Sequence, residues 1–564
     1  MTDPGLNSPT WLRRSALPAL SALLSLVIVG PLLGGGFVLN YDMVFSPTQP
    51  LVPDSLGLGS APARSVPADA VIAGLTHVLP GDLVQKLILF LAFFLGPLGA
   101  GRLVPTESTG VRLVAAVGYG WTAYLAERLF MGHWPYLLAY ACLPWIAAAG
   151  LALRRGEPKA WVRLVVWSAP AVLTPSGGLL AAGTAFAATG WRRALPTLAV
   201  VTVMNAPWWV PSVLRPGVSS PDAVALFDAR AENWGGAVTS VLGLGGYWNS
   251  EVVPASRELP LVPILTIAVT VVALLGFREL ARRWEPAAAI LGLGALGVFL
   301  AVLGTIPVGA EILRWAVSEI PGAGLLRDAQ KWVAWWALPL ALGFAVATEQ
   351  AARHLPRGRL AVFAAAALLP VVSMPDLAFA GLGRLETVHY PQDWADVRGI
   401  LLADDQPGDV LTLPLSTFRR FAWNGDRTQL DPAPRILPKT TVIDDTVHVG
   451  GRPVAGEDTR LPPIRETLAA HGDLGAVGIG WVLVEHGTPG VVDPEVLAPL
   501  AERYGGEWLT LYRVPGPMDT ATAVGPTRFP VLLADFSALL IVTVSWLWLA
   551  LPTGRLSGLT RREE

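Results

Sequence analysis

A carboxylate follows the first long apolar stretch of the chain, in the run Asn40-Tyr41-Asp42. If that stretch crosses a membrane, Asp42 lies where the chain leaves the lipid. A carboxylate in that position can activate a hydroxyl as a general base, or hold a divalent cation near a phosphate. The structural alternative, which position alone favours slightly, is an interface anchor in which Tyr41 joins the aromatic belt and Asp42 caps a turn.

A cation and an imidazole lie close together further along the chain. Arg128 follows Glu127, and the turn Gly132-His133-Trp134-Pro135 comes shortly after. At a membrane surface these groups could neutralise a lipid-linked phosphate or shuttle a proton. A Gly-Pro turn with an interfacial Trp134 and a snorkelling Arg128 explains the same residues equally well.

A second basic group occurs in the run Arg327-Asp328-Ala329-Gln330-Lys331. Arg327 and Lys331 are four residues apart, so on a helix they share one face. We expect this segment on the outer side of a membrane, where basic residues are disfavoured, and the pair therefore indicates an anionic partner such as a phosphate. An ion pair between Asp328 and Lys331, with ordinary snorkelling, is an equally weighted alternative.

Aromatic and polar residues gather in the segment 214–258. Sugar rings stack on aromatic faces, and their hydroxyls bond to carboxylates and amides. The sequence contains 22 tryptophans, however, so a core or interface role is the more frequent one for any of them. The candidate substrate-binding residues are Asp228, Trp234, Tyr247 and Trp248, together with Trp134.

The composition indicates which elements must position these residues. Of the 564 residues, 52% are hydrophobic and only 15% are charged, and the mean hydropathy is +0.50. Such a chain needs lipid as part of its solvent. The formal net charge of -2 gives no reason to expect a nucleic-acid partner. The single cysteine, Cys142, excludes an intramolecular disulfide and a cysteine-based metal cluster.

Twelve apolar runs are long enough to be considered as membrane spans. Basic residues fall in alternate connections between them, which predicts an even number of spans with both termini in the cytoplasm. The last basic group is Arg555, Arg561 and Arg562 of the tail, and 160–190 could be a re-entrant hairpin instead of two spans. The predicted spans are 16–38, 84–104, 110–129, 135–152, 160–174, 177–190, 194–213, 259–277, 286–306, 331–348, 358–374 and 529–551.

The longest connection, 375–528, changes character and contains charges of both signs and many prolines. Its helix-like segments 393–403, 464–470 and 493–504 each precede a β-rich one, which indicates a small α/β domain. The expected fold is an α-helical polytopic membrane protein with about twelve transmembrane helices and an extracytoplasmic α/β domain. The predicted domains are 1–374, with outer loops 39–83, 214–258 and 307–330, then 375–528, and finally 529–564 with the last span and a basic tail.

These features resemble the GT-C superfamily of multi-spanning glycosyltransferases, which use polyprenyl-phosphate sugars on the outer face of the membrane. The resemblance is to arabinosyl- and mannosyltransferases of the actinobacterial cell envelope, and the composition is typical of a high-GC bacterium. It is carried by the acid after the first span, the turn at 132–135 followed by Tyr140 to Trp145, the run 327–332, and the start of the outer domain at His389-Tyr390-Pro391.

The resemblance implies roles for individual residues. Asp42 would be the catalytic base, Arg327 and Lys331 would hold the donor phosphate, and Arg128 and His133 match more loosely. It implies a multi-pass protein of the bacterial plasma membrane whose partners are the lipid bilayer, a polyprenyl-phosphate sugar donor and an envelope glycan or lipid acceptor. Whether a divalent cation takes part stays open.

Three hypotheses follow from the sequence. The leading one is transfer of a sugar from a polyprenyl phosphate to an envelope glycan, lipid or protein. A lipid-linked sugar transporter or flippase would need polar residues in the middle of its spans, where Asn205 is the main one. A non-catalytic scaffold would use the outer domain to assemble envelope enzymes.

Overall fold

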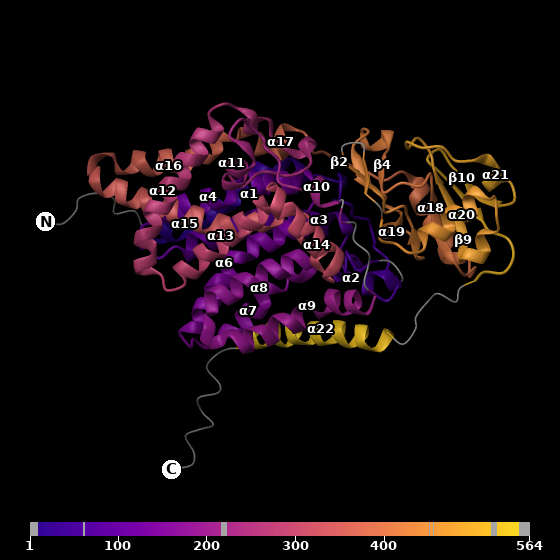
Figure 1. Cartoon of the computed structure of the whole chain (residues 1–564), viewed down its shortest axis with the longest axis horizontal. Coiled ribbons are helices and arrows are strands. Elements are labelled where there is room, and N and C mark those ends of the chain that lie inside the picture. Colours follow the sequence, from indigo (N-terminus) through magenta and orange to yellow (C-terminus); the bar gives the residue numbers. More distant parts are fainter. Residues whose placement is uncertain are drawn as a thin grey trace, which may run out of the picture.

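The computed structural model describes residues 10–59, 62–215, 221, 223–449, 452–454, 456–519 and 527–551. The predicted basic tail with Arg555, Arg561 and Arg562 lies outside the described residues. A helical part makes up most of the molecule, and a smaller region that contains a β-sheet lies at one end of it (Figure 1).

Eight helices of the described residues are long and apolar enough to cross a membrane. A span of the hydrocarbon core needs about 20 apolar residues, so these helices make the chain a multi-pass membrane protein. They are α1 (Thr10–Val29), α3 (Gly81–Leu103), α6 (Trp134–Arg154), α9 (Ala194–Leu214), α12 (Val262–Arg283), α15 (Ala334–His354), α16 (Arg359–Ser373) and α22 (Arg528–Ala550). An adjoining 3₁₀ turn extends α1, α9, α15 and α16, and it brings the shorter α16 to the length of a span.

The count of twelve spans is not confirmed, and one reason is a break in the segment 110–129. It forms two short helices, α4 (Thr109–Gly120) and α5 (Ala123–Phe130). The chain leaves the helical conformation at Trp121, and the hydroxyl of Thr122 accepts a hydrogen bond from the Leu125 amide at 3.3 Å. This N-cap starts a new helix, and neither piece is long enough to cross a membrane alone.

Prolines begin new helices at two other breaks in the helical part. The segment 160–190 forms α7 (Ala160–Ser168) and α8 (Pro175–Thr189), each shorter than a span. The segment 286–306 forms α13 (Ala287–Leu303), and α14 (Pro307–Glu319) follows at an angle of 92°. Proline favours the first turn of a helix and disfavours helical backbone in the residue before it. If α13 and α14 count as one broken span, the total is nine.

Small residues bring the membrane helices close together. A Cβ atom on Gly276 of α12 would lie 2.1 Å from the carbonyl oxygen of Gly343 in α15. A Cβ on Gly343 would in turn lie 2.3 Å from the Ala273 carbonyl oxygen. Because lipid offers no hydrophobic driving force between helices, such close backbone packing is a main source of their association.

The sheet-containing region has a five-stranded mixed sheet with the strand order β10-β11-β9-β3-β6. β3 is parallel to β6 and β9, whereas β11 is antiparallel to β9 and β10. The strands are β3 (Asp409–Leu413), β6 (Thr441–Val442), β9 (Ile479–Glu485), β10 (Ala501–Gly505) and β11 (Leu509–Arg513).

Helices cover both faces of this sheet. Trp481 and Leu483 of β9 pack in one cluster with α18 (Gln392–Ala403), and Val482 and Val484 pack in another with α20 (Leu461–Ala469). Strands buried on both faces are typical of an α/β layer structure. The first two predicted helix–strand units are therefore present. The third is wrong, because α21 (Pro494–Leu497) is only one turn long and the rest of the segment forms β10. The domain boundaries at 374 and 528 stay predictions.

The connection after α1 binds directly to the sheet-containing region. β1 (Phe37–Val38) pairs with β2 (Thr387–Val388), and the Leu430 amide donates to the Tyr41 carbonyl at 2.8 Å. Tyr390 donates its hydroxyl proton to the Phe45 carbonyl at 2.8 Å. The region carrying Asp42 is thus held between the helical part and the sheet-containing region. Smaller elements here include α2 (Ala68–Thr76), α17 (Ala378–Leu382), α19 (Ala433–Ile436), and the hairpins β4 (Phe418–Arg420) with β5 (Thr428–Leu430) and β7 (Val447–Val449) with β8 (Arg452–Val454).

Candidate functional site

The structure brings Asp42 and His133 together. His133 Nε2 lies 2.9 Å from Asp42 Oδ2, and the two side chains are 11% and 36% exposed respectively. Asp42 is therefore fixed by a neighbour and still reachable by a ligand.

A close backbone approach produces this contact. The Asp42 amide donates to the Met131 carbonyl at 3.1 Å, next to Gly132. Gly132 has φ +76°, and a Cβ atom on it would lie 2.3 Å from the Met43 nitrogen and 2.4 Å from the Asn40 carbonyl oxygen. Only glycine fits such a position without a shift of the neighbouring backbone.

Arg128 determines which nitrogen of His133 carries the proton. Its Nη1 lies 2.8 Å from His133 Nδ1. A guanidinium can only donate, so Nδ1 accepts this bond and the neutral ring has its proton on Nε2. His133 therefore donates from Nε2 to the Asp42 carboxylate and orients it.

Arg128 is fully buried and lies at the centre of a polar network. It contacts Asp328 Oδ2 at 3.3 Å and donates to Gln330 Oε1 at 2.5 Å. The ring centroids of Tyr124, Tyr136 and Tyr247 lie 5.4, 5.2 and 4.7 Å from its guanidinium carbon. A buried cation needs such partners to offset the loss of hydration.

Asp328 is the counter-ion of this network. Burial opposes its ionisation, but the nearby charges of Arg128 and Lys331 hold its pKa below the ordinary value. Lys331 Nζ lies 3.8 Å from Asp328 Oδ2 and 5.9 Å from the Tyr136 ring centroid. Lys331 thus adjoins the Arg128 network and is 12% exposed.

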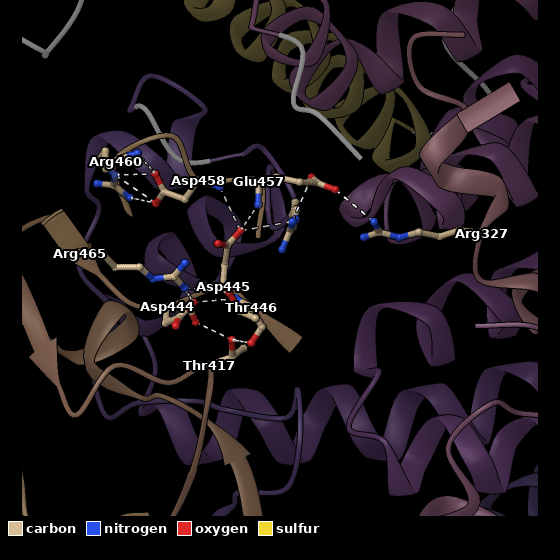
Figure 2. Close-up of polar contacts among 10 residues, drawn as sticks. Arg327, Thr417, Asp444, Asp445, Thr446, Glu457, Asp458, Arg460 and Arg465 are labelled. Carbon is tan, nitrogen blue, oxygen red and sulfur yellow. Dashed lines mark hydrogen bonds and ion pairs between the residues drawn. The ribbon is translucent and has the colours of Figure 1, made fainter. Parts of the chain in front are cut away.

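Arg327 points away from the network, toward the sheet-containing region. Its Nη1 lies 3.2 Å from Glu457 Oε1, as Figure 2 shows. Its guanidinium carbon lies 5.6 Å from the ring centroid of Phe227. The segment Ala329–Val333 is a 3₁₀ turn, so Arg327 and Lys331 do not share the face that an α-helix would give them.

The aromatic candidates separate into two groups. Tyr247 is buried, its ring centroid lies 6.1 Å from that of His133, and Trp248 packs against it at 5.4 Å. Trp134 is buried against Phe45, with 5.3 Å between centroids. Trp234, by contrast, is 67% exposed and donates to the Pro260 carbonyl at 2.9 Å, without a contact to the other candidates in the described residues.

Asp228 has its Oδ1 atom buried without a hydrogen-bond partner in the described part of the chain. A Cβ atom on Gly304 would lie 1.8 Å from this oxygen, so the carboxylate packs directly against the chain at Gly304. Burial raises the pKa of Asp228 to about 6.

Sequence reasoning gave no site role to a buried acid group behind Arg128. Gln330 donates to Glu127 Oε2 at 2.9 Å, and Arg257 donates to Glu232 at 2.8 Å. The available signal was Arg128 itself, since an arginine in an apolar segment needs a counter-ion and hydrogen-bond acceptors. The sequence could not show that Asp328 and Gln330, about 200 residues away, supply them.

The described residues bring together no group of three or more His, Cys, Asp or Glu side chains that could hold a metal ion. Asp42 has one potential co-ligand, His133, which donates a hydrogen bond to it in this arrangement. We therefore assign no residues to a divalent cation.

The comparisons with known proteins agree with this architecture. No protein-family profile and no curated protein sequence matches the chain. Among solved structures, it is similar to arabinofuranosyltransferase AftD from mycobacteria, with 17% identity and a TM-score of 0.52 over 92% of this chain. A mutant of the same enzyme gives 16% identity and a TM-score of 0.52. The chain spans only 40% and 42% of those two chains. The chain therefore shares the fold of part of a much longer arabinofuranosyltransferase.

Proposed function

We propose that this chain is a membrane glycosyltransferase that transfers a sugar from a polyprenyl-phosphate donor to a glycan, lipid or protein of the cell envelope. The observation that carries the proposal is the contact of 2.9 Å between His133 and the partly exposed Asp42. Its site lies next to the sheet-containing region, and its fold is similar to that of an arabinofuranosyltransferase. An arabinofuranosyl donor is accordingly the first to test.

Asp42 would act as the general base. It takes the proton of the acceptor hydroxyl, whose oxygen forms a bond to the anomeric carbon of the donor sugar. The bond from that carbon to the phosphate oxygen breaks, and the polyprenyl phosphate leaves with the electron pair. His133 holds the carboxylate in the orientation for this step.

Lys331 is the better placed of the two basic residues proposed for the donor phosphate. Lys331 and Arg128 both form an ion pair with Asp328, whereas Arg327 pairs with Glu457. A cation near the leaving phosphate would stabilise the charge that develops on it. Arg128 would contribute indirectly, by fixing His133 and Asp328. Asp228, Tyr247, Trp248 and Trp134 remain candidates for sugar contacts, and the extracytoplasmic side of the site and of the sheet-containing region is part of the proposal.

Replacing Asp42 by asparagine tests the proposal. General-base catalysis contributes about a hundred- to ten-thousandfold, so Asp42→Asn should reduce the rate of sugar transfer by that order. The measurement uses the purified full chain in lipid nanodiscs with a polyprenyl-phosphate arabinofuranose donor and an arabinan acceptor.

Asp82→Asn is the matched control. Asp82 has a similar exposure of 33%, pairs with Lys86 at 2.8 Å, and lies at the start of α3 after the same connection. Its replacement should leave transfer nearly unchanged. Full transfer activity in a normally folded Asp42→Asn protein would remove the assignment of Asp42. A scaffold or a transporter would show no transfer with the wild-type chain at all.

A further inference from the structure

A large pocket lies at the end of the helical part that is remote from Asp42. Its volume is about 770 Å³, within the range of small-molecule sites. The C-terminal ends of α3, α6, α12 and α15 surround it, together with the connection 104–108. The sequence predicts this end to be cytoplasmic.

The distance between this pocket and the candidate site follows from the helix α6. This helix begins at Trp134, beside His133, and its 21 residues end at Arg154, next to the pocket. At 1.5 Å per residue, α6 is about 30 Å long, which is the thickness of the hydrocarbon core. If α6 crosses the hydrocarbon core, the end of the pocket at Arg155 lies at the level of the lipid headgroups of the opposite leaflet, and the end at Pro144 reaches deeper between the helices.

Positive charge dominates the lining of the pocket. Three glutamates, Glu107, Glu157 and Glu349, face twice as many arginines. Glu349 pairs with two of these arginines, Arg283 at 2.6 Å and Arg353 at 3.4 Å. The six arginines are Arg102, Arg112, Arg155, Arg163, Arg283 and Arg353.

Two of the arginines have no carboxylate partner among the described residues, so their guanidinium groups can bind an anionic ligand. Arg102 and Arg155 are exposed and form no ion pair with any described residue. Arg102 lies over the ring of Trp145, with 5.3 Å from its guanidinium carbon to the ring centroid. The retention of basic residues on the cytoplasmic side explains a basic loop, but it does not require the arginines to line a pocket.

A buried donor provides an independent indication of a ligand. Trp284 lines the pocket and is 2% exposed, and its Nε1 donates to no acceptor among the described residues. A buried N–H group without a partner costs free energy that a ligand oxygen would recover.

We propose that this pocket binds a phosphate ester, namely the phosphodiester headgroup of an anionic phospholipid or a soluble phosphate monoester of similar size. Arg102 and Arg155 would contact the phosphate oxygens, because guanidinium groups bind phosphate with charge-assisted hydrogen bonds. Trp284 Nε1 would donate to a remaining oxygen. Basic pockets between transmembrane helices at the headgroup level are suited to anionic lipids.

The test measures binding of dihexanoylphosphatidylglycerol to the full-length protein in neutral detergent, by calorimetry and native mass spectrometry. Dihexanoylphosphatidylcholine is the zwitterionic comparison, and glycerol 3-phosphate is the soluble phosphate. Each arginine near an anionic lipid contributes roughly fivefold, so the double variant R102Q/R155Q should weaken phosphatidylglycerol binding on the order of 20-fold.

The matched control is R192Q/R193Q. These arginines belong to another connection predicted on the same side but do not line the pocket. This control should bind within about twofold of wild type. A second test variant, Trp284→Phe, leaves every charge in place and removes only the donor, and it should weaken binding by about tenfold. It keeps the test decisive if the double variant does not fold.

Selective binding of phosphatidylglycerol without glycerol 3-phosphate would support the proposal with a lipid as the source. Competition by glycerol 3-phosphate would support it with a soluble ester as the source. Equal binding of the two lipids would overturn the proposal. So would wild-type affinity for phosphatidylglycerol in R102Q/R155Q or, if that variant does not fold, in Trp284→Phe.

Discussion

At the residue scale, the orientation of Asp42 depends on groups that do not touch it. His133 contacts the carboxylate, Arg128 fixes the tautomer of His133, and Asp328 and Gln330 hold Arg128. Arg128, Asp328 and Gln330 are buried, and in such surroundings the local dielectric is low and polar contacts are strong. The proposed base is thus the exposed end of a buried, charge-balanced network.

Asp228 provides a prediction about pH at the same scale. Its pKa is raised to about 6, so the folded state binds its proton more tightly than the unfolded state does. This contribution to stability is fully present below about pH 4 and is lost as the pH rises to about 6. The free energy of unfolding of Asp228→Asn should therefore rise by roughly 2 kcal/mol relative to that of wild type between pH 4 and pH 7, after allowance for the partial exposure of Asp228.

The measurement is the thermal unfolding temperature of both proteins in the same detergent across this pH range. The difference between the two curves isolates Asp228 from the other titrating groups. Parallel curves would show that Asp228 has an ordinary pKa and is better hydrated than the structure indicates.

At the scale of elements, two connections place Asp42 against His133. The first leaves α1 and pairs with the sheet-containing region, and the second joins α5 to α6 through Gly132. The two backbones are so close at Gly132 that a side chain there would collide with Asn40 and Met43. The site is therefore a property of the crossing of these connections.

Gly132→Ala should disturb this crossing. The alanine Cβ would force the two connections apart, and a misplacement of about 1 Å can reduce catalysis by around a hundredfold. We expect a comparable loss of sugar transfer with the substrate affinity less affected, measured in the nanodisc assay.

Gly156→Ala is the control for this variant. Gly156 has a similar φ of +71°, but a Cβ atom there would meet nothing within 4 Å. Both variants carry the strain of a left-handed residue, whereas only Gly132→Ala carries the collision. Equal activities of the two variants would argue against the role of the close approach.

At the scale of the whole molecule, ion pairs join the sheet-containing region to the helical part. Glu457 pairs with Arg327 at 3.2 Å (Figure 2). Glu457 also pairs with Arg64 at 3.0 Å, and Arg64 reaches Asp445 at 3.4 Å. Arg64 belongs to the connection that follows Asp42 in sequence, and Arg327 precedes the segment of Asp328 and Lys331. The position of the sheet-containing region is thereby linked to both sides of the candidate site.

Glu457→Gln should loosen this attachment. Partly exposed ion pairs contribute about 1 kcal/mol or less each, so hydrogen exchange in segments 62–66 and 323–328 should accelerate severalfold. The effect should diminish in 1 M salt, where the wild-type pairs are themselves screened. The control is Glu466→Gln, because Glu466 is an exposed residue of α20 in the same region. This variant should leave hydrogen exchange in segments 62–66 and 323–328 unaltered. Unchanged exchange in Glu457→Gln would show that backbone pairing alone holds the region.

Local physical chemistry determined much of this molecule from the sequence alone. Apolar runs of about 20 residues need lipid, which indicated a multi-pass membrane protein. The alternation of helical and β-rich segments indicated an α/β region, including α18 before β3 and α20 before β9. The sequence also singled out Asp42, His133 and Arg128 as residues able to do chemistry. Span boundaries were less determined, because α4 stops before Trp121 within the predicted span 110–129 and α7 ends at Ser168 within the predicted span 160–174.

Only the tertiary structure decided which of these residues meet. The contact between Asp42 and His133 joins positions 91 residues apart, and the contact between Arg128 and Asp328 joins positions 200 apart. No local pattern encodes such pairings, because they depend on how helices pack and connections cross. The same reason explains Arg327 and Lys331, which are neighbours in sequence. Lys331 lies within the 3₁₀ turn Ala329–Val333 and reaches the Arg128 network, whereas Arg327 precedes this turn and pairs with Glu457. Two similar cations therefore have different surroundings.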